Sequence, residues 1–386
     1  MGENYGYHKM MIKRYLTEQV KKDLQKKMVF LGGPRQVGKT TLARSLSSNE
    51  SYLNWDDSED RERILKRELP TNRLWIFDEI HKYKQWRNYL KGLYDKNKLE
   101  KEILVTGSAR LDLYRRGGDS LQGRYHFLRL HPLSLDELTS QKKNDLNQLF
   151  ELGGFPEPFF SSSKIDSKRW SREYRQRILQ EDILSIERIE DIGMAELLMM
   201  RLPELVSGPL SINSLREDLQ VSHKTVSRLL DIFERFYAIF RLSAFGSPKV
   251  KAVKKEMKHY HYDWTLVPNE GARFENMIAC HLIKWCQYYE DTQGKDMQLS
   301  FFKDNEKREV DFVISESKKP ICFIETKLSE KTISSSLNYL KKKFPNVKSF
   351  QILYDSPFDF QSDLGIRVGP AYKLLPEIRS ILAADE

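Results

Sequence analysis

The segment GGPRQVGKTTLA, residues 32–43, decides the fold of this chain. It follows the apolar run Met28 to Leu31, which is typical of a buried strand, and it leads into a stretch with helical spacing. Its pattern GxxxxGK(S/T) is that of a loop whose backbone N–H groups turn inward onto phosphate oxygens. We therefore expect the phosphates of a nucleotide to be bound by Gly33, Pro34, Arg35, Gln36, Val37, Gly38, Lys39, Thr40 and Thr41.

Two side chains of this loop have individual roles in the prediction. Lys39 is expected to act in catalysis by neutralising β- and γ-phosphate oxygens, and the Thr40 hydroxyl is expected to bind Mg²⁺. The helix that follows would add the positive end of its dipole. The sequence thus predicts ATP and Mg²⁺ as cofactors.

A second apolar run, at residues 74–77, ends in the acidic pair Asp78 and Glu79. Two adjacent carboxylates are costly unless a cation shares them. We expect Asp78 to hold Mg²⁺ through its water shell and Glu79 to polarise the attacking water as the catalytic base. The alternative is that the pair only caps the next helix.

A third run, Ile103 to Thr106, ends in a turn that carries hydroxyl groups. Ser108 is the first choice for a catalytic residue that senses the γ-phosphate, and Thr106 is the second; the alternative is an ordinary turn after a strand. All three runs deliver polar residues to one edge and are separated by helical stretches. This pattern predicts an α/β fold with a parallel sheet and a ligand at the carboxyl ends of its strands.

The length of 386 residues predicts two or three domains. We expect a P-loop ATPase domain at 1–140, a helical domain at 141–245 and a further α/β domain at 246–386. In the middle domain helical periodicity dominates, interrupted by the turn GGFPEP at 153–158. Aromatic and β-branched runs return in the third domain and predict strands there.

The composition bears on partners and location. A net charge of +9 favours a polyanion such as DNA, although charges of both signs are interleaved and the excess is equally compatible with a solvated surface. Three cysteines without CxxC spacing predict neither disulfides nor a zinc site, which fits a reducing, cytoplasmic setting. Residues 1–10 lack the core of a signal peptide, and no apolar run approaches the roughly 18 residues of a membrane helix, so we expect no membrane partner.

Residues 212–230 have the apolar spacing of a helix-turn-helix. Ser222 would cap the second helix. The outer face of that helix would carry residue types that contact DNA, namely His223, Lys224, Ser227 and Arg228. A winged helix that binds DNA is one interpretation, and a unit that only packs or contacts proteins is the other.

Several segments together resemble one known family. Beyond the phosphate-binding loop they are WDD at 55–57, IFDEIHKYKQW at 76–86, LVTGSARLDLYRRGGDSLQGRYHFLRLHPLSLDEL at 104–138 and GGFPEP at 153–158. They resemble the bacterial and archaeal AAA+ ATPases of the archaeal ATPase-like, AAA-14 type, which carry a C-terminal domain of unknown function. The resemblance covers nearly the whole chain. It implies a homo-oligomer, and it singles out Arg124 as the catalytic arginine finger or sensor.

Three short segments nearer the C-terminus resemble the core of the PD-(D/E)XK nuclease superfamily: RFEN at 273–276, EVDFV at 309–313 and IETK at 324–327. The resemblance implies that Glu275, Asp311 and Glu325 bind Mg²⁺. It also implies a catalytic role for Lys327, on the same strand face as Glu325, which would orient the attacking water or offset developing charge. Three interpretations stay open: an active metal-dependent deoxyribonuclease, a fold kept for binding nucleic acid, and a purely structural domain.

The sequence as a whole predicts an ATPase that couples ATP binding and hydrolysis to action on DNA through a winged helix and a nuclease-like domain. One alternative is a nucleotide-dependent switch that controls protein assembly, with an inactive nuclease-like fold. Another is a DNA-binding protein that hydrolyses ATP only slowly.

Overall fold

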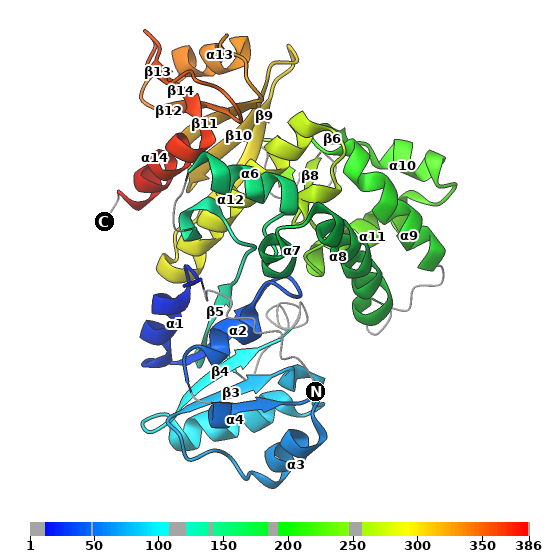
Figure 1. Ribbon diagram of the computed structural model, residues 1–386, viewed down its shortest axis with the longest axis vertical. Helices are drawn as coiled ribbons and strands as arrows, with labels where there is room; N and C mark the ends of the chain where they lie inside the picture. Colours follow the sequence, from blue (N-terminus) through cyan, green and yellow to red (C-terminus); the bar gives the residue numbers. More distant parts are fainter. Residues whose placement is uncertain are drawn as a thin grey trace, which may run out of the picture.

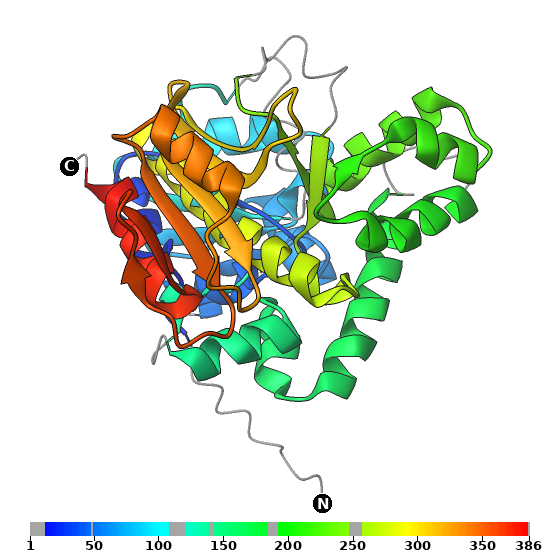
Figure 2. The same ribbon diagram turned by 90° about the horizontal axis from the view of Figure 1, so that it is seen from above.

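A computed structural model of the chain describes residues 12–47, 49–107, 121–138, 142–183, 192–246 and 257–384. Two β-sheets lie at opposite ends of the molecule, with the long helix α12 (Glu270–Gln293) between them (Figure 1). Seen from above, the C-terminal sheet lies over the N-terminal one, and the helices of the middle region extend to one side (Figure 2).

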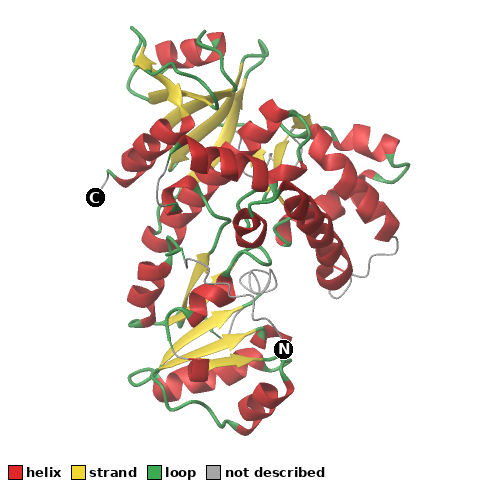
Figure 3. Cartoon of the chain, viewed as in Figure 1, coloured by secondary structure: helices red, strands yellow, loops and turns green. Residues whose placement is uncertain are grey.

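The N-terminal sheet has five parallel strands in the order β2-β3-β4-β1-β5 (lower half of Figure 3). Their bounds are β1 Met28–Gly32, β2 Tyr52–Asn54, β3 Leu74–Asp78, β4 Glu102–Thr106 and β5 Tyr125–Arg129. Successive side chains of a strand point to opposite faces of the sheet. In β1, Met28 and Phe30 pack into one core and Val29 and Leu31 into another, which explains an uninterrupted apolar run. The predicted α/β fold with a parallel sheet is confirmed.

The sequence predicted three of these strands and missed β2 and β5. β2 has only three residues, and Tyr125 and His126 of β5 are half-buried, so neither strand reads as an apolar run. The helices of this region are α1 Thr17–Leu24, α2 Lys39–Arg44, α3 Ser58–Lys66 and α4 Trp86–Asn97. Asp57 caps α3, because its side chain accepts hydrogen bonds from the N–H groups of Glu59 and Asp60 at 3.0 Å each.

The middle region is helical, as predicted. Its first helices are α6 Lys143–Leu152, α7 Pro156–Ser161 and α8 Lys164–Arg177, which continues as a π-helical turn, Ile178–Ile183. The GGFPEP segment breaks the first two apart: Gly153 has a φ of 83°, and Pro156 occupies the first turn of α7.

A compact unit of three helices and three short strands follows. It consists of α9 Ile192–Arg201, β6 Pro209–Leu210, α10 Ile212–Asp218, α11 His223–Arg235, β7 Ile239–Ser243 and β8 Met257–His261. The strands form an antiparallel sheet in the order β6-β8-β7. Ser222 caps α11 as predicted, accepting a hydrogen bond from the Thr225 N–H at 3.0 Å. The domain boundary expected between residues 245 and 246 falls in the connection between β7 and β8, which pair with each other.

The C-terminal sheet is mixed and has the strand order β13-β14-β12-β11-β10-β9. Its strands are β9 Met297–Lys303, β10 Glu309–Glu316, β11 Lys319–Lys327, β12 Lys348–Leu353, β13 Phe360–Gln361 and β14 Ile366–Pro370. Helix α12 lies on its inner face, and α13 (Ser335–Lys343) lies on its outer face (Figure 1). The last helix is α14, Ala371–Ala383.

One hydrophobic core runs through the whole molecule. It includes Leu31 from the N-terminal sheet, Phe233 from the middle region, Trp285 from α12 and Ile324 from the C-terminal sheet. The outer face of each sheet has a core of its own. Helices α1 and α2 pack on the inner face of the N-terminal sheet, and α12 packs both on its edge strand β5 and on the C-terminal sheet.

No helix within the described ranges combines the length and apolar character needed to cross a lipid bilayer.

Gly154 should be essential to the fold, because a Cβ there would lie 2.6 Å from both the Leu133 carbonyl oxygen and the Trp264 ring. We expect Gly154→Ala to reduce the free energy of unfolding by about 1–3 kcal/mol through overpacking. Gly92 in the exposed face of α4 is the matched control, since a Cβ there meets nothing within 4 Å. Gly92→Ala should be neutral or stabilising by up to about 1 kcal/mol. Urea unfolding of both variants measures this, and equal effects would contradict it.

Candidate functional site

The predicted phosphate-binding loop lies at the carboxyl end of β1 and needs two glycines. Gly33 has a φ of 129°, and a Cβ on it would lie 2.2 Å from the Leu130 carbonyl oxygen. Gly38 has a φ of 99°. Both conformations are ones that residues with a Cβ rarely adopt. The loop therefore turns tightly from the strand into α2.

Lys39 is the first residue of α2 and is buried. Its Nζ donates hydrogen bonds to two carbonyl oxygens of the loop itself, those of Gly33 at 2.9 Å and Pro34 at 2.6 Å. Both carbonyl groups belong to the loop, so the ammonium group of Lys39 lies inside it, and its predicted role in catalysis stays a prediction.

Asp78 lies at the end of β3 and accepts hydrogen bonds from three hydroxyl groups. They come from Thr40 at 2.8 Å, Tyr52 at 2.6 Å and Thr106 at 2.7 Å. The structure thus brings together the two residues predicted to hold Mg²⁺, Thr40 and Asp78. Thr106, the second choice for a nucleotide sensor, contacts Asp78, and Ser108 lies outside the described residues.

Tyr52 is a site residue that the sequence reasoning missed. It belongs to the short edge strand β2, which pairs with β3 so that Tyr52 stands opposite Ile76. Burial and the neighbouring Asp78 raise the pKa of its hydroxyl, which therefore stays protonated and donates to the carboxylate. The only signal in the sequence is a tyrosine a few residues after the loop helix.

Glu79 follows Asp78 with a φ of 56°, a conformation that turns its side chain away from the direction of the strand. Its backbone N–H donates to the Thr106 carbonyl oxygen at 3.0 Å. The carboxylate lies 3.4 Å from both His81 and Lys82 and makes no capping hydrogen bond to the turn Ile80–Lys82. Burial raises the pKa of Glu79, although Lys82 opposes this. The alternative that Glu79 merely caps a helix is therefore not what the structure shows.

Arg124 lies far from the loop of its own chain. Its backbone carbonyl accepts a hydrogen bond from Met28 at the start of β1, whereas the loop follows the end of that strand. The guanidinium pairs with Asp95 through contacts of 2.8 and 3.1 Å. An arginine finger at this position would have to serve a neighbouring subunit, so the predicted role of Arg124 stays a prediction.

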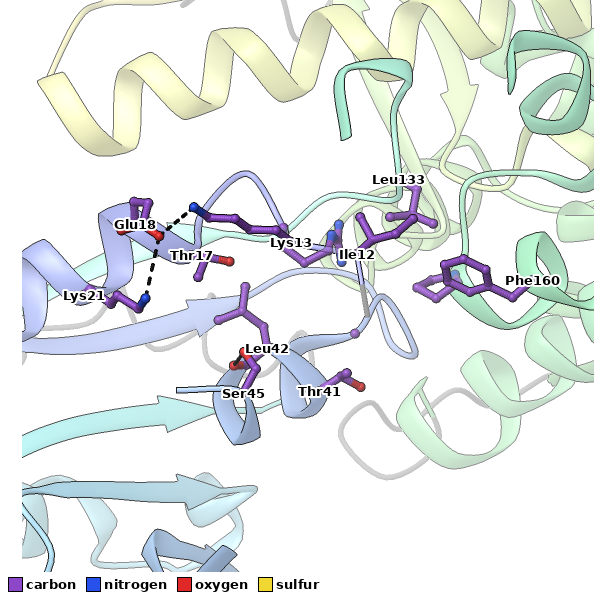
Figure 4. A pocket seen from close by; sticks show the side chains of 13 residues that line it. Ile12, Lys13, Thr17, Glu18, Lys21, Thr41, Leu42, Ser45, Leu133 and Phe160 are labelled. Atoms are coloured by element: carbon purple, nitrogen blue, oxygen red, sulfur yellow. Dashed lines mark hydrogen bonds and ion pairs between the residues drawn. The ribbon is translucent and has the colours of Figure 1, made fainter. Parts of the chain in front are cut away.

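A cavity of about 440 Å³ lies beside the loop (Figure 4). Its walls come from the N-terminal segment and α1, from α2, and from the start of the middle region: Ile12, Lys13, Arg14, Thr17, Glu18, Lys21, Gly38, Thr41, Leu42, Ser45, Leu133, Pro156 and Phe160. Ile12, Leu133 and Phe160 form an apolar end, and Glu18 pairs with Lys13 and Lys21 at the other. The sequence predicted a turn at GGFPEP but not that Pro156 within it lines a pocket.

A second cluster of charged side chains lies around β10 and β11 of the C-terminal sheet and contains the predicted residues Glu275, Asp311, Glu325 and Lys327. Lys327 pairs with Glu325 at 3.1 Å. Asp311 on β10 accepts hydrogen bonds from the N–H and hydroxyl of Thr326 on β11, at 2.8 and 2.7 Å. Residues from segments far apart in the sequence therefore meet at this cluster.

The centre of this cluster holds a lysine for which the sequence predicted no role. Lys258 of β8 is 1% exposed, and its Nζ lies 2.6 Å from Glu309, 3.3 Å from Glu275 and 3.9 Å from Asp311. Tyr260 of the same strand donates to Glu275 at 2.7 Å. A side-chain cation therefore offsets part of the negative charge.

The remaining negative charge is reflected in the pKa values of the carboxyl groups. Burial, and next the charge of Asp311, raise the pKa of Glu275 to about 7 and that of Glu325 to about 8. One oxygen of Glu325, Oε2, is buried and has no hydrogen-bond partner. Among the described residues no group of three His, Cys, Asp or Glu side chains is arranged to hold a metal ion, so the predicted Mg²⁺ ligands of this domain stay a prediction.

Helix α11 presents the side chains that the sequence placed on its outer face. His223, Lys224 and Arg228 are exposed and Ser227 is half-buried, while Val226 packs into the core. The orientation of the helix is as predicted; its ligand is not shown.

Comparisons with known proteins assign the three regions separately. Residues 25–139 match the family model described as an AAA domain. Residues 143–270 and 270–374 match two models described as domains of unknown function, DUF8612 and DUF4143.

The chain is also similar to several uncharacterized proteins. One from Mycobacterium tuberculosis is 26% identical over 321 residues, which cover 76% of this chain and 71% of that protein. One from Methanocaldococcus jannaschii is 23% identical over 363 residues, covering 83% and 80%, and one from Haemophilus influenzae is 22% identical over 297 residues, covering 66% and 74%.

Two solved structures are more distant, at 14% identity each. A signal transduction ATPase with numerous domains from Pyrococcus horikoshii has a TM-score of 0.22 and aligns over 72% of this chain and 47% of that one. The Hsp104–ADP complex of S. cerevisiae has a TM-score of 0.29, with 58% and 38% covered. These TM-scores are too low to support an argument.

The loop geometry, the parallel sheet and the match to the AAA domain agree with one another. The chain thus carries an AAA-type ATPase domain in residues 25–139, followed by regions that match DUF8612 and DUF4143.

Proposed function

We propose that this chain binds ATP together with Mg²⁺ at the loop of residues 33–41 and hydrolyses it, with Glu79 as the base. The observation that carries the proposal is the 2.8 Å contact between the Thr40 hydroxyl and Asp78 at the mouth of the loop. A hydroxyl and a carboxylate are the oxygen ligands that Mg²⁺ prefers in proteins. A residue in the first turn of α2 and a residue at the end of β3 therefore meet where a nucleotide's phosphates would lie.

The donor set fits a magnesium–triphosphate. Lys39 supplies a buried positive charge, and two of its partners are loop carbonyl oxygens that a phosphate oxygen can replace. Thr40 and Asp78 would hold the Mg²⁺ ion, which would neutralise charge on the phosphates. Glu79 lies next to Asp78 and would accept a proton from the attacking water.

Glu79→Gln should retain ATP binding and lose turnover. We expect the rate of hydrolysis to fall by about 10²–10⁴-fold, because the amide keeps the shape of the side chain and cannot act as a base. Phosphate release measures turnover, and a fluorescent ATP analogue measures affinity. Glu59→Gln on the neighbouring helix is the matched control and should behave as the wild type. Undiminished turnover in Glu79→Gln would exclude Glu79 as the base.

We further propose that the cavity beside the loop accepts the adenine base. Its volume lies within the range of about 300–1,000 Å³ that is usual for small-molecule pockets. It extends from Gly38 and Thr41 of the nucleotide loop to the apolar side chains Ile12 and Phe160. A planar base next to bound phosphates would be covered by these apolar groups.

Phe160→Ala should separate recognition of the base from recognition of the phosphates. We expect the affinity for ATP to fall about tenfold, equivalent to about 1.4 kcal/mol, while the affinity for magnesium tripolyphosphate stays unchanged. Isothermal titration with both ligands measures this. Ile165→Ala is the control, because Ile165 is exposed on α8 and does not line the cavity. An equal loss for both ligands would place the defect in the loop and not in a base pocket.

For the rest of the chain we propose action on DNA. The order α9-β6-α10-α11-β7-β8, with the sheet order β6-β8-β7, supports a winged-helix unit. The exposed His223, Lys224 and Arg228 on α11 are residue types that contact phosphates and bases. The alternative is that the same helix face contacts a protein.

The acidic cluster of the C-terminal domain supports two candidate functions. The pairing of Lys327 with Glu325 beside Asp311, and the unpartnered Glu325 Oε2, favour a metal-dependent nuclease. Lys258, which already supplies a cation to Glu275, Glu309 and Asp311, favours an inactive fold. In the second case the chain would be a nucleotide-dependent switch that controls protein assembly.

Cleavage assays separate these candidates. Labelled single-stranded, duplex and branched DNA would be incubated with Mg²⁺ or Mn²⁺, with and without ATP. If the protein is a nuclease, Asp311→Ala removes a metal ligand, and we expect its cleavage rate to fall about 100-fold or more. Glu316→Gln at the far end of the same strand is the control. If the wild-type protein hydrolyses ATP but cleaves DNA under none of these conditions, the nuclease is excluded and the nucleotide-dependent switch is the remaining candidate.

Assembly into a homo-oligomer remains part of the proposal, because Arg124 can reach a nucleotide only in a neighbouring subunit. Sedimentation velocity with and without ATP tests this, and a monomer under both conditions would rule out Arg124 as a finger in trans.

A further inference from the structure

Arg14 lies directly beneath the nucleotide loop, and all three of its guanidinium nitrogens are engaged. Nη1 donates to the Val37 carbonyl oxygen at 2.6 Å, Nη2 to the His131 carbonyl oxygen at 2.5 Å, and Nε to Glu137 Oε1 at 2.7 Å. The side chain is only 8% exposed. Val37 immediately precedes Gly38, so Arg14 fixes the last turn of the loop before α2.

Glu137 connects this arginine to another part of the molecule. While its Oε1 accepts from Arg14, its Oε2 accepts from Lys284 at 2.7 Å. Burial alone would raise the pKa of Glu137, but Arg14 and Lys284 outweigh burial and lower it. The carboxylate is therefore charged and shared between two cations.

Lys284 belongs to α12, the helix of the C-terminal domain. It is 1% exposed, and besides Glu137 it contacts Asp136 at 3.3 Å and the Ser134 hydroxyl. Neighbouring turns of the same helix face also contact the segment after β5: His281 accepts from the Leu135 N–H at 3.1 Å. Two turns of α12 thus contact the segment that follows β5.

The other end of α12 reaches the acidic cluster. Glu275 lies nine residues before Lys284, which is about 13 Å along a helix that rises 1.5 Å per residue. An unbroken helix therefore joins the side chains that contact Lys258 to those that contact Glu137.

We propose that Arg14, Glu137 and Lys284 form a coupling chain through which the packing of α12 sets the shape of the nucleotide loop. Arg14 is then a positioning residue for ATP, and the C-terminal domain regulates the affinity of the ATPase domain for its nucleotide. The inference rests on the proposed binding of ATP. Because coupling between two sites is reciprocal, ATP would also change the free energy of events at the acidic cluster.

The physical basis is the cost of leaving a buried charge without its partner. If α12 shifts so that Lys284 leaves Glu137, the carboxylate depends on Arg14 alone, and Arg14 can give up its bond to Val37 to compensate. The loop then loses the contact that holds its last turn. A shift of α12 could therefore change the shape of the loop although it makes no direct contact with the nucleotide.

A double-mutant cycle between Glu137→Gln and Lys284→Met in the full-length protein tests the proposed coupling of Arg14, Glu137 and Lys284. Each single change should lower the affinity for ATP about tenfold, and the double variant should be no weaker than either single variant, because both remove the same link. Hydrogen exchange of the backbone amides of residues 35–38, measured without nucleotide, should become faster in all three variants. If Lys284→Met does not fold, Glu137→Gln and Arg14→Lys give the same two readouts.

Asp291→Asn is the matched control. Asp291 lies on the same face of α12, is 2% exposed, and pairs with Arg129 at 2.6 Å without contacting the loop. It should lower stability and leave ATP affinity and loop exchange unchanged. The proposed coupling is contradicted if Asp291→Asn weakens ATP binding as much as Lys284→Met does. It is also contradicted if Lys284→Met binds ATP with the affinity of the wild type and its loop amides exchange at the wild-type rate. If the wild type and Lys39→Ala bind ATP equally well, the proposed ATP site is refuted. Hydrogen exchange of residues 35–38 would still show whether Glu137 and Lys284 affect the loop.

Discussion

The structure depends on one packing constraint: the inner faces of two separate sheets must both be covered, and α12 contributes to covering each. Trp285 and Leu282 of this helix belong to the same core as Leu31 of the N-terminal sheet and Ile324 of the C-terminal sheet. A hydrophobic surface shared in this way disfavours independent movement of the two ends, since separation would expose it to water. The charged contacts along α12 then determine in which register the two halves meet.

Buried charges recur wherever two regions meet in this protein. Glu137 is shared by Arg14 and Lys284, Asp291 pairs with Arg129, and Lys258 lies among carboxylates. Such pairs add little net stability compared with apolar packing, but removing one partner is costly. Their value in this protein is specificity: each can form only in one arrangement of the regions that contribute to it.

The sequence was most informative where a function is encoded in consecutive residues. The glycine-rich loop at 33–41, the acidic pair at 78–79 and the cap at Ser222 depend on local spacing and turn chemistry, and each adjoins the strand or helix that the sequence predicted for it. The sequence did not predict Tyr52, Lys258 or Pro156 as site residues, because distant segments bring them to the sites. A lysine within a lysine-rich stretch, for example, gives no sign that its neighbours in space will be three carboxylates.

The position of Arg124 in the sheet explains why the sequence alone did not show how far it lies from the loop of its own chain. Sequence spacing placed it after the third predicted strand, but the start of a strand and its end lie on opposite edges of a parallel sheet. Because β5 was not predicted, the edge on which Arg124 lies was not predictable either.

Strand β8 belongs to two regions of the molecule at once. It completes the small antiparallel sheet next to α10 and α11, yet its Lys258 and Tyr260 supply partners to Glu275 of the following helix. Its His261 backbone is also bound on both sides by Asn276, at 2.9 and 2.7 Å. The border at residue 270 between the two matched regions therefore cuts through a shared polar interior. A fragment that starts at residue 270 would bury Glu275 and Asn276 without their partners, so the smallest cooperative folding unit of the C-terminal half includes β8.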